Sequence, residues 1–124
     1  MDQPLALICS GNAILSNQLA NRLTDLGYRV QVLHSADDLV DQAQRAKPFL
    51  ILADLVIQGV DLLPGIQKLR NDSTTRHIPW LGITTESGQE FHSRAIKSGA
   101  TLVAMENGIL AQLPQLLDQA LLVE

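Results

Sequence analysis

The stretch that decides the fold is residues 48–61, which read PFLILADLVIQGVD. Within it, residues 49–53 form a continuous apolar run that ends at an acidic residue, Asp54. Short runs that do not alternate with polar residues are typical of strands in a parallel sheet, because helices cover both faces of such a sheet. Further mainly apolar runs occupy residues 5–9, 30–33, 80–83 and 102–105, of which the second contains Gln31. We therefore predict five buried parallel strands.

The segments between these runs have the apolar spacing of amphipathic helices, at intervals of three and four residues. This spacing predicts helices over residues 14–26, 35–46, 64–71, 87–98 and 110–122. Gly27 suits the position after a helix C-terminus, Ser35 suits an N-cap, and Pro64 suits the first position of a helix. Five strand and helix units joined by right-handed crossovers predict an α/β fold: a doubly wound, five-stranded parallel sheet of (βα)5 type.

Length and composition indicate one globular domain. The chain has 124 residues, against roughly 150 for an average domain, so we expect a single domain over residues 1–124. Hydrophobic residues make up 46% of the chain, which is enough for a buried core. Nine Lys and Arg against thirteen Asp and Glu give a net charge of −4 with no basic block, so we do not expect nucleic acid as a partner.

Neither a membrane segment nor a secretory signal is expected. No apolar stretch approaches the roughly 20 residues of a membrane span, and the first residues, Met1-Asp2-Gln3, lack the basic start of a signal peptide. Cys9 is the single cysteine and has no intramolecular disulfide partner, which agrees with a reducing compartment. These features predict a cytoplasmic protein.

Candidate functional residues lie where the predicted strands end. In open α/β sheets, functional groups collect at the carboxyl ends of the strands. The residues found at these positions are Ser10, Gly11, Asn12, Asp54, Thr84 and Glu106. We therefore expect a pocket that contains two carboxylates and several neutral polar groups.

Three strings, taken in order, resemble a bacterial response-regulator receiver domain of the CheY-like type. They are residues 48–61, residues 76–84 (RHIPWLGIT) and residues 98–100 (SGA), and the similarity covers essentially the whole chain. The resemblance implies a flavodoxin-like topology. It also places Asp54 at the phosphoacceptor position, Thr84 at the position of the Ser or Thr switch residue, and Val103 at that of the aromatic switch residue.

The resemblance does not extend to the phosphorylation chemistry. Receivers carry an acidic pair that falls here on Ser10 and Gly11, and a lysine that falls on Glu106. Phosphoryl transfer to a carboxylate requires a divalent cation and a fixed ammonium to neutralise charge, and neither source is visible here. We therefore predict a degenerate pseudo-receiver without metal, cofactor or enzymatic activity, which acts through protein-protein contacts.

Two alternatives remain open. The first is a working phosphoacceptor of a two-component phosphorelay, in which Asp54, Glu106 and waters hold Mg²⁺. The second is an enzyme, since residues 9–16 (CSGNAILS) resemble the phosphate loop of low-molecular-weight protein tyrosine phosphatases, with Cys9 as the nucleophile. That family needs an arginine where this chain has Leu15, so the loop lacks the bidentate cation that clamps phosphate.

The last predicted helix suggests a partner surface. Its apolar residues cover about half of its circumference, which is wider than a helix needs to cover a sheet. We expect the surplus to form an interface that includes Leu110, Leu113, Leu117 and Leu121. Receivers commonly pair through this region, so the resemblance implies a homodimer, or docking of a histidine kinase or an output domain. The other reading is that Pro114 bends the helix and the surplus is buried.

Overall fold

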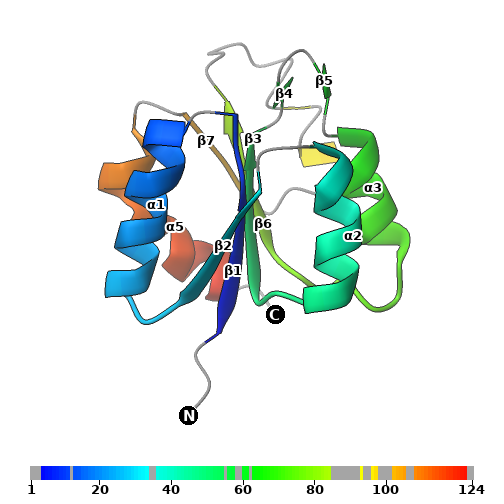
Figure 1. Ribbon diagram of the computed structural model, residues 1–124, viewed down its shortest axis with the longest axis horizontal. Helices are drawn as coiled ribbons and strands as arrows, with labels where there is room; N and C mark the ends of the chain where they lie inside the picture. Colours follow the sequence, from blue (N-terminus) through cyan, green and yellow to red (C-terminus); the bar gives the residue numbers. More distant parts are fainter. Residues whose placement is uncertain are drawn as a thin grey trace.

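The chain forms a parallel sheet between two layers of helices (Figure 1). The computed structural model describes residues 4–11, 13–33, 36–54, 56–57, 60–61, 63–84, 93, 96–97, 102–105 and 108–122. The sheet consists of β1 (Leu5–Cys9), β2 (Arg29–Leu33), β3 (Leu50–Asp54), β6 (Trp80–Thr84) and β7 (Leu102–Met105), in the order β2-β1-β3-β6-β7. Every neighbouring pair in it is parallel. The predicted doubly wound five-stranded sheet is therefore confirmed.

Among the described residues, α1 (Ala13–Asp25) and α5 (Ile109–Leu122) lie on one face of the sheet, and α2 (Ala36–Ala46) and α3 (Leu63–Asn71) lie on the other (Figure 1). On the first face, α1 and α5 bury a cluster that includes Leu19, Leu52 and Leu113. On the other face, α2 and α3 bury a second cluster around Leu39 and Trp80. All five residues of β3 and of β6 are buried, as expected for central strands covered on both sides.

Several predicted element bounds differ from those observed. The first helix ends at Asp25, one residue before the predicted end. Ile14 and Leu26, which lie at the ends of the predicted range, are 74% and 47% exposed. The third helix begins at Leu63, so Pro64 is its second residue, which still lies in the first turn, where no intrahelical N–H is required. Ser35 lies outside the described residues, and so does most of the predicted helix 87–98, although positions 93 and 96–97 are helical.

A short antiparallel hairpin follows the central strand and was not predicted. It consists of β4 (Val56–Ile57) and β5 (Val60–Asp61). Residues 48–61 did not predict this hairpin, because a strand of two residues is too short to show an alternation of apolar and polar residues.

The end of α1 explains how the chain reaches β2. Gly27 has φ +97°, its N–H donates to Thr24 O at 3.0 Å, and the N–H of Tyr28 donates to Leu23 O at 2.9 Å. This pair of bonds is a Schellman motif, which satisfies the last carbonyls of the helix. Glycine is favoured here because a side chain is strained in this backbone conformation. The predicted cap at Gly27 is confirmed.

The apolar stripe of α5 is mostly buried, which corrects the predicted interface. Leu113 is fully buried and Leu117 is 5% exposed, and both belong to the core cluster on the α1 side. Leu110 is half-buried against the same cluster, and the side chain of Leu121 lies outside the description. The stripe is wide because α5 contacts α1 as well as β6 and β7, so it covers two surfaces. The prediction of Leu113 and Leu117 as partner contacts was therefore wrong.

None of the helices in the described part of the chain is both long and apolar enough to span a bilayer.

Candidate functional site

Three neighbouring strands end at the same edge of the sheet, and each leads to a buried polar residue. Ser10 directly follows β1, Asp54 is the last residue of β3, and Thr84 is the last residue of β6. Cys9 is in register with Ala53, and Asp54 with Ile83, so the three strand ends lie at one level. Ser10 is fully buried, and Asp54 and Thr84 are 8% and 9% exposed. The predicted gathering of polar groups at this edge is therefore observed for these three residues.

The loop after β1 binds the carboxylate of Asp54 directly. The hydroxyl of Ser10 donates to Oδ2 of Asp54 at 2.8 Å, and the backbone N–H of Gly11 donates to the same oxygen at 3.0 Å. Both donors are neutral, so they orient the carboxylate without bringing positive charge. Ser10 and Gly11 are separated from Asp54 by 44 and 43 positions in the sequence, and the fold brings them into one hydrogen-bonded site.

The other predicted pocket and switch residues have different positions. Val103 is half-buried, in register with Gly82, and packs against the core on the α2 and α3 side. It therefore acts as a packing residue in the sheet. Asn12 and Glu106 lie outside the described residues.

The two donors on Asp54 occupy an oxygen that could otherwise bind a cation. Mg²⁺ requires octahedral oxygen ligands and is commonly held by one or two carboxylates together with waters. Here Oδ2 accepts an O–H and an N–H, whose positive hydrogens face the oxygen that a cation would use. Over the ranges that the structure describes, there is no group of three His, Cys, Asp or Glu residues able to hold a metal ion.

Cys9 does not have the placement of a loop nucleophile. It is fully buried in the core cluster that contains Leu39 and Ile51, on the face covered by α2 and α3. Leu15, which stands where a phosphate-binding arginine would be needed, is 4% exposed and packs on the opposite face of the sheet. These positions argue against the cysteine phosphatase alternative, since a reactive thiolate must be accessible.

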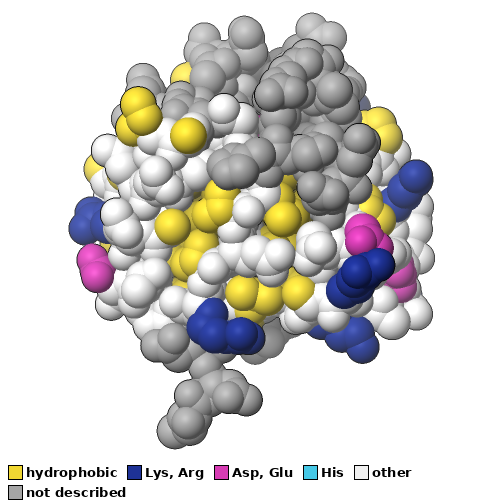
Figure 2. Space-filling view, in the orientation of Figure 1, with side chains coloured by type: hydrophobic (Ala, Val, Ile, Leu, Met, Phe, Trp, Pro, Cys, Tyr) yellow, Lys and Arg dark blue, Asp and Glu magenta, His cyan; other side chains and the backbone are white. Residues whose placement is uncertain are grey.

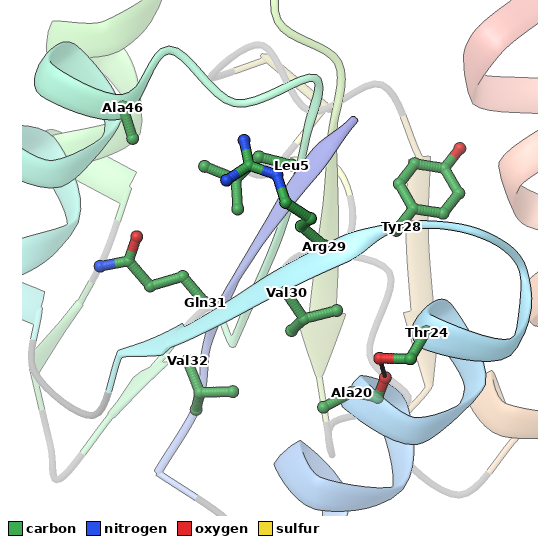
Figure 3. A pocket seen from close by; sticks show the side chains of 9 residues that line it. All are labelled: Leu5, Ala20, Thr24, Tyr28, Arg29, Val30, Gln31, Val32 and Ala46. Carbon is green, nitrogen blue, oxygen red and sulfur yellow. Dashed lines mark hydrogen bonds between the residues drawn. The ribbon is translucent and has the colours of Figure 1, made fainter. Parts of the chain in front are cut away.

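A second feature was missed from the sequence: an open groove along the outer side of β2 (Figure 3). Its volume is about 880 Å³, and its lining residues are Leu5, Ala20, Thr24, Tyr28, Arg29, Val30, Gln31, Val32 and Ala46. The run 30–33 predicted the strand, but only the order of the sheet shows that β2 lies at its edge.

Tyr28 is one of the residues that line this groove. Its ring meets that of Phe49 edge to face, with centroids 6.5 Å apart and an interplanar angle of 74°. Burial, and to a smaller extent the carboxylate of Asp118, raise the pKa of Tyr28 above its ordinary value of 10.0. Its hydroxyl therefore remains protonated and uncharged at neutral pH.

Known proteins resemble this chain in sequence and in structure. No family model matches the sequence. The response regulator PleD of Caulobacter vibrioides is 34% identical over 83 residues, which are 67% of this chain and 18% of PleD. The chemotaxis protein CheY4 of Vibrio cholerae superposes with a TM-score of 0.86 at 20% identity, over 95% of this chain and 98% of CheY4.

The chain has the response-regulator receiver fold. A second receiver structure agrees: the BeF3-activated N-terminal receiver domain of RstA from Klebsiella pneumoniae gives a TM-score of 0.84 at 20% identity, over 94% of this chain and 97% of that domain. The strand order of the receiver fold is the flavodoxin-like one that the resemblance implied. The chain spans only 18% of the length of PleD, so the similarity concerns one part of that protein.

Proposed function

We propose that the chain is a signal-transduction receiver domain that acts through protein-protein contacts, and that its Asp54 site is not a phosphoacceptor. The observation that carries this proposal is the pair of neutral donors, Ser10 Oγ and Gly11 N, on Asp54 Oδ2. They occupy the place where the receiver resemblance leads us to expect a pair of carboxylates. The site is therefore built to hold a carboxylate in place without a cation.

Charge explains why this arrangement disfavours phosphorylation. An aspartyl phosphate adds negative charge to a buried position, and Asp54 is only 8% exposed. Stabilising that charge requires a cation or a fixed ammonium close by. Ser10 and Gly11 offer neutral hydrogen-bond donors. The sequence also has Glu106 at the position where the receiver resemblance leads us to expect a lysine.

The partner in this proposal is another protein, such as a histidine kinase or an associated output domain, and the location is the cytoplasm. The receiver fold and the similarity to a response regulator support a signalling role. The net charge of −4 supports a protein partner over nucleic acid.

The alternative function is a working phosphoacceptor that uses Asp54. One observation favours it: Asp54 ends the central strand β3, and Thr84 ends the strand beside it, as the receiver resemblance requires. In this alternative, Mg²⁺ must either displace the two donors from Oδ2 of Asp54 or bind Asp54 without using that oxygen.

Incubation with a small-molecule phosphodonor and Mg²⁺, followed by intact mass spectrometry, separates the two functions. We expect no phosphoryl adduct under conditions in which an active receiver, assayed in parallel, is fully phosphorylated. The matched control is Asp54→Asn, because an adduct on any other residue persists in this variant. A stoichiometric adduct on the parent that is absent from Asp54→Asn would establish the phosphoacceptor alternative.

A further inference from the structure

We draw no further inference here: the strongest candidate, the groove along the outer edge of β2 over which hydrophobic side chains gather (Figure 2), has an uncharged strand centre that suits any extended segment, and nothing in the structure shows what covers it.

Discussion

At the scale of single residues, Ser10 is the side chain that distinguishes this site. It is fully buried and donates to Asp54 at 2.8 Å, so it replaces a carboxylate of the receiver pattern with a donor. Its role is to position Asp54 against the loop that follows β1. The backbone N–H of Gly11 supplies a donor that every substitution except proline retains.

We predict that Ser10→Ala lowers the free energy of unfolding by about 1.5–3 kcal/mol, since it removes a buried hydrogen bond to a carboxylate. Urea unfolding followed by circular dichroism measures this loss. The matched control is Ser73→Ala, an exposed position, where a change within about 0.5 kcal/mol is expected. Equal effects of the two substitutions would mean that the Ser10 bond does not stabilise the fold.

At the scale of elements, the two helices beside β2 end differently. α1 ends with Gly27 at φ +97°, where a Cβ would meet no atom within 4 Å. α2 is followed by Lys47 at φ 48°, which is a non-glycine residue in the left-handed region. Left-handed conformations cost a side chain roughly 1–2 kcal/mol and cost glycine little.

Substitutions at Gly27 and Lys47 are therefore predicted to change the stability of the protein in opposite directions. Gly27→Ala should destabilise the protein by about 1–2 kcal/mol through backbone strain alone, because the site has space for the methyl group. Lys47→Gly should stabilise it by up to about 1 kcal/mol, since it relieves the same strain. Thermal unfolding of both variants and of the parent shows whether each substitution raises or lowers the stability. A stabilised Gly27→Ala would show that the cap geometry tolerates a side chain.

At the scale of the whole molecule, Asp72 joins α2 to the loop after α3. Its Oδ1 accepts the backbone N–H of Thr74 at 2.9 Å and the Thr74 hydroxyl at 2.8 Å, and its Oδ2 accepts from Gln44 at 2.8 Å. The backbone bond from Thr74 first, and then its hydroxyl, hold the pKa of Asp72 below its ordinary value of 3.8. The ionised carboxylate is therefore the form that the folded state favours.

A depressed pKa contributes stability above the unfolded value, and this stability is lost as the pH falls through the folded value. We therefore expect Asp72→Ala to be less stable than the parent at neutral pH, with a difference that shrinks below pH 3.8. Urea unfolding at a series of pH values measures this convergence. Thr74→Val keeps the backbone donor, so it should retain most of the pH dependence. A difference that stays constant across this range would contradict the assignment.

The sequence by itself determined the local structure and which residues stand at the strand ends. Strands and helices follow short-range periods, and the cap at Gly27 depends on neighbouring residues only. The sequence also showed that Asp54 ends an apolar run, and that Ser10 and Gly11 stand where receivers have acidic residues. Both observations need only the order of residues along the chain. The rule that strand ends meet at one edge predicted that Ser10 and Asp54 lie together. The hydrogen bond between them is shown by the structure.

Tertiary structure alone decided which surfaces are available to a partner. The wide stripe of α5 is buried because α1 and two strands, all distant in sequence, lie against it. β2 has an open edge because its only neighbour in the described sheet is β1, which precedes it in the chain. Burial depends on what the rest of the chain brings to a surface, and a local pattern cannot contain that information.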